Sequence, residues 1–397
     1  MGLESYGPAL LSRPPGIRHD HVRKAAGLRL ELANTIGSAG WFKALEMVPR
    51  ERFLGDAVYL PHKGRDDLWA PMRCADTGEA EWLALVYANE TWVTQVGGVM
   101  AEDASELVTG RPSSSSTLPG LVVRMLEAAR IGEGDKVLEI GTGTGYSTSL
   151  MCQRLGSDAV TSIEYDPVVA VRARDAIRKA GYTPTLVVGD GLYGYAENAE
   201  YDRLISTCSV RTIPLAWPQQ VRDGGTITAP MRGWMGGVAF AHLTVAGDGA
   251  ASGRFLKDDL SFMTARSHLP PPLPPLVRGV GDVRETRIDP SVLDDQAALW
   301  VAQLAVPQAQ CVWGENDTTF LIDVDAGSRA VVEPQATGGW AVHQHGPVKL
   351  WDAIEDAVLM WREAGRPHQS TFGLTVAPER QRVWLGDADG PSWNLPA

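Results

Sequence analysis

The most constraining feature of this chain is a regular alternation of short apolar segments and amphipathic segments between residues 121 and 230. Strands that alternate with helices of roughly 10 to 15 residues form βαβ units, which build a mostly parallel sheet with helices on both faces. An antiparallel hairpin should follow at 238–256, because Asp248 and Gly249 form a typical turn pair. The sequence therefore predicts a doubly wound α/β core. Its strands are expected at 136–140, 159–164, 185–189, 201–207 and 224–230, and its helices at 121–130, 146–155 and 167–180.

The first predicted strand runs into a glycine-rich turn, GTGTG, and then into a helix. Gly141, Gly143 and Gly145 allow a tight turn and let a ligand approach the backbone at the carboxyl end of a strand. A dinucleotide site is the alternative, but its G-x-G-x-x-G spacing needs glycine or alanine where this chain has Tyr146. Glu139, inside the strand, would repel a pyrophosphate and attract an ammonium group. The turn therefore favours S-adenosylmethionine over NAD.

Carboxylates follow the next two predicted strands. Glu164 ends the second strand, where it could bind ribose hydroxyls, and Asp190 follows the third, where it could reach the adenine amino group. Because the carboxyl ends of parallel strands meet at one edge of a sheet, these groups should surround one ligand. The predicted cofactor-binding residues are Glu139, Gly141, Thr142, Gly143, Gly145, Glu164, Tyr165, Asp190 and Gly191.

A series of motifs resembles the protein-L-isoaspartate O-methyltransferase family in order and spacing. The motifs are VPRERFLGDAVYL, SSSSTLPGLVVRMLEAA, VLEIGTGTGYST, SIEYDPVVAVRARDAI, VVGDG, YDRLISTCSV and VRDGGTITAP, and the resemblance covers roughly residues 22–265. It implies a Rossmann-like class I S-adenosylmethionine methyltransferase core, S-adenosyl-L-methionine as the cofactor and a peptide carboxylate as the methyl acceptor. In that family a Ser-Gln-Pro motif helps to hold the substrate carboxylate, and it aligns here with Thr117-Leu118-Pro119.

The stretch GRPSSSSTLPG, residues 110–120, is either a flexible linker or a row of hydroxyl groups at a reaction centre. An apolar helix joins it directly to the predicted cofactor region, which argues for a site. An aspartate carboxylate, with a pKa of about 3.9, is already ionised and needs neutral donors to orient it rather than a general base. We therefore predict Ser115, Ser116 and Thr117 as the catalytic residues that hold the carboxylate, with Thr207 as a further candidate.

The chain departs from the family pattern in two ways: Thr-Leu replaces Ser-Gln, and the chain continues well beyond the matched region. This arrangement resembles family members that tailor ribosomally synthesised peptides in graspetide and lanthipeptide systems. The resemblance implies methylation of an aspartate side chain in a constrained, modified precursor peptide, leading to a succinimide (aspartimide) and, on hydrolysis, to isoaspartate. A repair enzyme acting on isoaspartyl peptides is the alternative. A non-catalytic peptide-binding protein and a small-molecule methyltransferase also remain open.

Four regions are expected along the chain. They are an N-terminal helical and irregular segment at 1–110, a methyltransferase domain at 111–267, a proline-rich linker at 268–280 and a smaller α+β accessory domain at 281–397. In the first region, 19–37 should be a helix that ends at Gly37, and 82–98 should be strand-like. The accessory domain is predicted to recognise the peptide, and most of its clustered tryptophans should lie in its core.

The composition narrows the choice of partners. With 48 acidic and 36 basic residues the net charge is −12, which disfavours nucleic acid and anionic membranes. The N-terminus lacks a signal-peptide pattern, and the four cysteines are scattered, so a cytoplasmic protein is expected. The His-x-His pairs at 19–21 and 343–345 lack a third ligand nearby, so no metal is predicted. The oligomeric state stays open.

Overall fold

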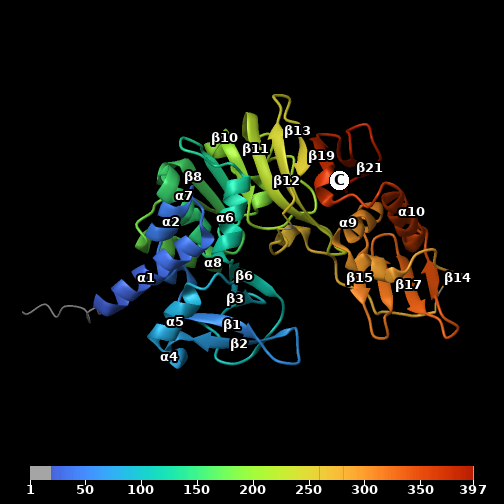
Figure 1. The fold of residues 1–397 in the computed structure, drawn as a ribbon, viewed down its shortest axis with the longest axis horizontal. Coiled ribbons are helices and arrows are strands. Elements are labelled where there is room, and N and C mark those ends of the chain that lie inside the picture. The colour runs from blue at the N-terminus through green and yellow to red at the C-terminus, as the bar shows by residue number, and fades with distance from the viewer. Residues whose placement is uncertain (1–18, 259, 280, 397) are drawn as a thin grey trace, which may run out of the picture.

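The computed structural model describes residues 19–258, 260–279 and 281–396, with side chains from Val22 onward. These residues form three β-sheets, of six, ten and five strands. Figure 1 places the ten-stranded sheet at the top, with the N-terminal sheet and the five-stranded sheet below it on opposite sides. The first 18 residues, on which the expectation about a signal peptide rests, lie outside the described residues.

The ten-stranded central sheet confirms the predicted α/β core. Its strand order is β21-β20-β19-β13-β12-β11-β10-β7-β8-β9. The strands from β9 to β11 pair in parallel, and the hairpin of β12 and β13 continues the sheet with antiparallel pairing. The strands are β7 (Val137–Ile140), β8 (Val160–Glu164), β9 (Thr185–Val188), β10 (Tyr201–Ser206), β11 (Val221–Arg232), β12 (Val238–Val245) and β13 (Ala251–Phe255), and the helices beside them are α6 (Pro119–Ala128), α7 (Tyr146–Leu155) and α8 (Pro167–Lys179).

Helix α8 shows how the sequence sets these boundaries. The Asp166 carboxylate accepts hydrogen bonds from the backbone N–H groups of Val168 and Val169, at 2.8 and 3.2 Å, and Pro167 occupies the first turn. Apolar residues on one face, including Ala173 and Ile177, are buried. The amino end of α8 is therefore fixed at the edge of the sheet where the parallel strands end.

The N-terminal region forms a sheet that the sequence did not predict. Its helices are α1 (His19–Ile36), α2 (Phe42–Met47), α3 (Glu51–Leu54), α4 (Cys74–Thr77) and α5 (Glu79–Val86), and its strands are β1 (Ala57–Pro61), β2 (Leu68–Arg73), β3 (Trp92–Val96), β4 (Val99–Met100), β5 (Val108–Thr109) and β6 (Pro112–Ser116). The helix predicted to end at Gly37 is confirmed. The strand prediction over 82–98 is wrong in its first half, because Trp82, Leu83 and Val86 form the buried face of α5.

The C-terminal residues divide between two sheets. The helices are α9 (Gln296–Ala305) and α10 (Leu350–Glu363), and the strands are β14 (Asp282–Glu285), β15 (Gln310–Trp313), β16 (Thr319–Asp323), β17 (Ser328–Pro334), β18 (Trp340–His345), β19 (Phe372–Ala377), β20 (Arg380–Leu385) and β21 (Ser392–Asn394). Strands β14 to β18 form the five-stranded sheet, whereas β19 pairs with β13 and extends the central sheet with β20 and β21. The segment 281–397, predicted as one accessory unit, therefore contributes its last strands to the core.

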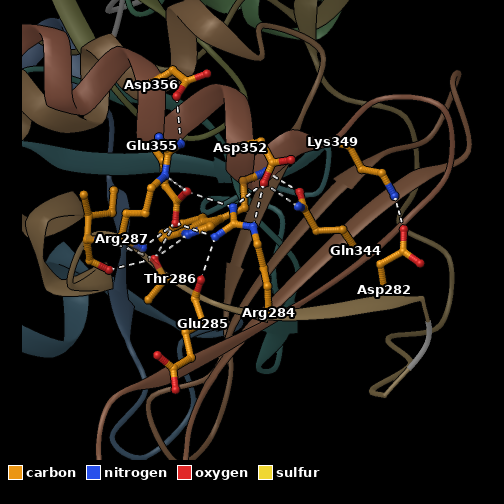
Figure 2. A network of polar contacts seen from close by, with 12 residues as sticks. Asp282, Arg284, Glu285, Thr286, Arg287, Gln344, Lys349, Asp352, Glu355 and Asp356 are labelled. Atoms are coloured by element: carbon orange, nitrogen blue, oxygen red, sulfur yellow. Dashed lines mark hydrogen bonds and ion pairs between the residues drawn. The ribbon is translucent and has the colours of Figure 1, made fainter.

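A polar network attaches β14 and the turn after it to α10 (Figure 2). At its centre, Glu355 is fully buried and accepts hydrogen bonds from both guanidinium nitrogens Nη1 and Nη2 of Arg284, at 3.0 and 2.8 Å. Arg287 Nε and Thr286 Oγ1 also donate to this carboxylate, each at 2.7 Å. Such charge-assisted bonds fix β14 against the helix.

One hydrophobic core continues from the central sheet into the C-terminal region. Trp300 of α9 packs edge-to-face on Phe255 of β13, with ring centroids 5.3 Å apart. The expectation for the clustered tryptophans is confirmed, since Trp351, Trp361 and Trp384 are buried. The proline-rich segment 268–280 forms no strand in its described residues, although Gln310 Nε2 donates to the Pro271 carbonyl at 3.0 Å. The short 3-10 helices are η1 (Ser157–Ala159), η2 (Gly191–Tyr193), η3 (Ala196–Asn198), η4 (Arg266–His268), η5 (Pro290–Asp294) and η6 (Gln369–Thr371).

Candidate active site

A cavity of about 420 Å³ opens where β7, β8, β9 and β10 end, and the serine-rich strand β6 forms another of its walls. This is the edge at which doubly wound sheets bind ligands. Eleven of the residues singled out from the sequence line the cavity: Ser115, Ser116, Thr117, Gly141, Thr142, Gly143, Glu164, Tyr165, Asp190, Gly191 and Thr207. Two predicted residues, Glu139 and Gly145, do not line it. The predicted cofactor residues and the predicted carboxylate-holding residues thus share one enclosure.

The glycine turn needs glycine for two separate reasons. Gly141, Gly143 and Gly145 have φ angles of +98°, +55° and +90°, a region that other residues rarely adopt. A Cβ atom at Gly141 would also lie 2.5 Å from Thr207 Oγ1, and one at Gly145 would lie 2.8 Å from Ile177. Gly145 therefore serves the packing of α7 against α8, while Gly141 and Gly143 form the cavity wall.

Glu139 lies beneath the turn and not on the cavity wall, so the structure departs from the predicted ligand contact. Its side chain is fully buried, and its carboxylate accepts hydrogen bonds from the hydroxyls of Ser147, Thr148 and Ser162. Burial raises the pKa of Glu139 to about 7, although the three hydroxyl donors oppose this shift. Its observed contacts hold β7, β8 and α7 together under the turn.

The two strand-end carboxylates face the cavity and are both hydrogen-bonded. Glu164 accepts from the backbone N–H of Gly143 at 2.8 Å and from that of Asp166 at 3.0 Å. Burial raises the pKa of Glu164 despite these bonds. Asp190 accepts from the Leu192 N–H at 3.0 Å and from the hydroxyl of Ser267. Both side chains have remaining acceptor capacity, since a carboxylate offers about four lone-pair positions.

The serine stretch is a strand and not a flexible linker. Ser115 pairs with Val93, and Ser116 pairs with Trp92, in an antiparallel ladder between β6 and β3. Ser116 is only 1% exposed, whereas Ser115 and Thr117 are half-buried on the cavity wall. Ser115 and Ser116 are therefore held on a paired strand, and Thr117 follows directly after it.

A buried guanidinium lies behind this wall. Arg50 is fully buried and donates to the carbonyl oxygens of Val86 and Ala88 at 2.7 and 2.8 Å. Its other terminal nitrogen lies 3.4 Å from both oxygens of Ser116 and 3.3 Å from the Thr117 carbonyl oxygen. Burial lowers the pKa of Arg50 to about 10, so the group stays charged at neutral pH. Arg50 thus ties the end of β6 to the loop after α5.

Several lining residues come from a segment that the sequence did not single out. Residues 261–266 close one side of the cavity. Arg266 donates to Asp166 Oδ2 at 2.8 Å and to Gln95 Oε1 at 3.1 Å, and its guanidinium lies 5.6 Å from the Tyr165 ring centroid. It therefore links this segment to β3 and to the start of α8. The sequence LSFMTAR, residues 260–266, lies at the C-terminal limit of the region that resembles the family and is the signal in the sequence for this segment.

Neither a metal centre nor a reactive thiol is evident in the described residues. No group of three or more His, Cys, Asp or Glu side chains is placed there to hold a metal ion. Cys208 lines the cavity, but burial raises the pKa of its thiol to about 11. Within the described ranges, no helix combines the length and apolar character needed to cross a bilayer.

Known proteins share both the fold and the cavity region. A solved structure named protein-L-isoaspartate O-methyltransferase superposes with a TM-score of 0.51 at 20% identity, covering 91% of this chain and 99% of that chain. The fold is that of a class I S-adenosylmethionine methyltransferase. Because the likeness covers most of this chain, it extends well beyond the catalytic core.

The sequence comparisons concern a shorter region. The family model for protein-L-isoaspartate(D-aspartate) O-methyltransferase matches residues 92–249. A protein-L-isoaspartate O-methyltransferase of Ignicoccus hospitalis is 39% identical over 134 residues, 33% of this chain and 63% of that protein. A second such enzyme, of Archaeoglobus fulgidus, is 39% identical over 115 residues, 28% of this chain and 52% of that protein. This chain thus spans between half and two thirds of the curated relatives it matches.

Proposed function

We propose that this protein is an S-adenosylmethionine-dependent carboxyl O-methyltransferase that acts on L-isoaspartyl residues of proteins or peptides. The observation that carries the proposal is one cavity whose lining includes the serines of β6, the glycine turn, Glu164 of β8 and Asp190, which follows β9. The matched region 92–249 contains all of these elements. The names of the relatives support an isoaspartyl acceptor.

The residues around the turn fit the proposed cofactor. Glu164 and Asp190 offer acceptors for ribose hydroxyls and an adenine amino group, and Gly141 and Gly143 leave the wall free of side chains. Ile140 and Leu192 provide apolar surface for a ring system. When bound, S-adenosylmethionine supplies a methyl group on a sulfonium, and its transfer to a carboxylate oxygen forms an O–CH3 bond and leaves a neutral thioether.

The protein's own contribution to this reaction is positioning. The acceptor carboxylate is already ionised at neutral pH, so no residue needs to remove a proton from it. Hydroxyl donors of Ser115, Ser116 and Thr117 would orient one oxygen towards the methyl group and exclude water. Neutral donors leave more nucleophilic character on the carboxylate than a tight ion pair would. Arg50, behind β6, would keep the donors in place through the carbonyls it contacts.

A second acceptor is favoured by one observation, the Thr117-Leu118 pair where the family resemblance has Ser-Gln. On this proposal the substrate is a normal aspartate in a constrained, ribosomally made peptide. After methylation, the following backbone nitrogen attacks the ester carbonyl, methanol leaves and a succinimide forms. The length of the chain does not favour this proposal, because a solved structure named as an isoaspartate methyltransferase covers 91% of it.

Mass spectrometry with three peptides tests both proposals. The full-length protein is incubated with S-adenosylmethionine and a linear isoaspartyl peptide, its matched aspartyl peptide, or a cyclised peptide with an aspartate in the ring. We expect a gain of one methyl group on the isoaspartyl peptide. Modification of the ring aspartate alone would favour the tailoring enzyme, and no modification with no cofactor binding would contradict both.

Two substitutions separate the acceptor side from the cofactor side. Thr117→Val should lower turnover about tenfold or more while cofactor affinity by calorimetry stays close to wild type, because a hydrogen bond to a charged group is lost. Asp190→Ala should instead weaken cofactor affinity about tenfold. Thr109→Val, an exposed threonine outside the cavity, is the control. Equal turnover in the Thr117 variant and the control would remove this residue from the proposed site.

A further inference from the structure

Arg232, at the end of β11, differs from the other charged side chains that line the cavity. Glu164 and Asp190 accept hydrogen bonds from backbone N–H groups, and Arg266 forms an ion pair with Asp166. The Arg232 side chain donates one bond, from Nη1 to Ser261 Oγ at 3.3 Å, and has no ion-pair partner in the described part of the chain. A guanidinium has five N–H donors, so most of its donor capacity is unused.

The backbone holds Arg232 firmly while its side chain remains exposed. Its N–H donates to the Val210 carbonyl at 2.9 Å, and the residue pairs with Val238 of β12. The side chain is exposed and lines the cavity. Its guanidinium donors are therefore available to a ligand, and they extend from a backbone that the sheet holds in place.

The strand order places Arg232 away from the proposed cofactor contacts. Asp190 follows β9 and Arg232 ends β11, and the order β9-β8-β7-β10-β11 puts four strand spacings between them. With neighbouring strands about 4.8 Å apart, these strand ends are separated by about 19 Å. The glycine turn after β7 lies between them. A group bound by Arg232 would therefore belong to the acceptor side of the cavity.

We propose that Arg232 is a specificity residue that binds a second carboxylate of the acceptor peptide, on a residue next to the methylated one. This inference rests on the proposed function, because it assigns a substrate class to the same cavity. A chain with a net charge of −12 repels acidic peptides over long distances, so a local cation at the binding site would compensate for this repulsion. Guanidinium groups bind carboxylates through paired hydrogen bonds, which a hydroxyl cannot form.

Matched peptides and charge-swapped variants test the proposal. Isoaspartyl peptides that carry Glu, Gln or Lys beside the methylated residue are compared by kcat/KM, and their binding is measured directly by fluorescence anisotropy. Wild type should favour the Glu peptide over the Gln peptide about tenfold. Arg232→Gln should bring this ratio close to one, and Arg232→Glu should favour the Lys peptide. Cofactor affinity should change less than twofold in both variants.

Arg124→Gln is the matched control. Arg124 is an exposed arginine of α6, lies 3.8 Å from Asp258 and is not among the cavity-lining residues, so its variant should keep the wild-type preference. Equal rates on all three peptides in wild type, or a large loss of cofactor affinity in Arg232→Gln, would overturn the proposal while leaving the methyltransferase intact. If no peptide is methylated, the proposed function fails. In that case, tighter binding of the Glu peptide than of the Gln peptide, lost in Arg232→Gln, would still support a carboxylate site at Arg232. Equal binding of the two peptides would overturn the carboxylate site as well.

Discussion

Glu139 in the central sheet and Glu355 in α10 are both fully buried, yet their pKa values are shifted in opposite directions. Burial raises the pKa of Glu139 to about 7, because its donors are three neutral hydroxyls. Burial alone would also raise the pKa of Glu355. Hydrogen bonds from Arg284, Thr286 and Arg287 outweigh it and lower that pKa to about 2 (Figure 2).

The two buried carboxylates have different roles because their hydrogen-bond partners differ in charge. Near the proposed active site, neutral partners hold the turn without placing a fixed cation beside the cofactor position. In the C-terminal region, two guanidinium groups keep the carboxylate ionised and attach β14 to α10. The neutral partners of Glu139 add no positive charge near the cavity, whereas the charged partners of Glu355 attach strand β14 to helix α10.

The largest effect is expected for Glu355→Ala. Removing the carboxylate leaves Arg284 and Arg287 without their shared partner, so the free energy of unfolding should fall by about 3 to 5 kcal/mol. Denaturant unfolding measures this change. Asp356→Ala is the control, since that exposed carboxylate pairs with Arg287 Nη2 at 2.7 Å and its removal should cost less than about 0.5 kcal/mol. Equal losses in both variants would contradict the distinction.

The next largest effect is the dependence of the free energy of unfolding on acidic pH that Glu355 contributes. The folded-state pKa of Glu355, about 2, lies below its ordinary value of 4.5. Its stabilisation is therefore complete above about pH 4.5 and is lost as the pH falls towards 2, a change of about 3 kcal/mol. Urea unfolding monitored by circular dichroism at several pH values should show a shallower acid slope for Glu355→Gln than for wild type. Identical slopes would mean that other carboxylates dominate.

A smaller loss of stability is expected on substitution of Arg50, a buried cation that donates to uncharged carbonyl oxygens. Arg50→Lys keeps the charge, but an ammonium cannot reach both the Val86 and Thr117 carbonyls, so the free energy of unfolding should fall by about 2 kcal/mol. Turnover should fall with it, because Thr117 loses its support. Arg52→Lys, at a more exposed arginine of α3, should have little effect on either. Unchanged turnover in Arg50→Lys would argue against a positioning role.

The smallest effect is expected for Glu139→Gln. Because its folded-state pKa is raised from 4.5 to about 7, the folded protein keeps this proton longer, and stability falls as the pH rises through that window. The glutamine variant should lack this slope and be about 1 kcal/mol more stable than wild type at pH 8, since no buried charge forms. Thermal unfolding between pH 4.5 and 8 measures it. A variant that is less stable at pH 8 would contradict the neutral-partner interpretation.

Local patterns predicted the central sheet well, because its signals are short-range. The predicted helix over 146–155 has the bounds of α7, and the hairpin turns at Asp248-Gly249 as expected. The strand β6 escaped prediction because serine has weak β-propensity, and it forms through its pairing with β3. The pairing of Arg254 in β13 with Gly373 in β19 could not be predicted from the sequence either, because it depends on the register between distant segments.

Some residues of the candidate site could likewise be predicted from local sequence patterns, and others could not. The ends of successive parallel strands brought Gly141, Glu164 and Asp190 to one cavity, which strand order alone predicts. Arg50 and Arg266 belong to motifs of the family resemblance, but their contacts at the site join distant segments and depend on tertiary packing. For Glu139, the missed signal was the pair Ser147 and Thr148 directly after the turn, because their hydroxyls donate hydrogen bonds to its carboxylate.

The pairing of β19 with β13 has a consequence for biosynthesis. Strands β13 and β19 are separated along the chain by the whole five-stranded sheet, so the edge of β13 stays open while that sheet is being made. The central sheet cannot be complete until residue 394, the end of β21, has left the ribosome. During that interval the unpaired edge can join another nascent chain. Slowing translation after residue 255 should therefore lengthen exposure to chaperones and increase aggregation.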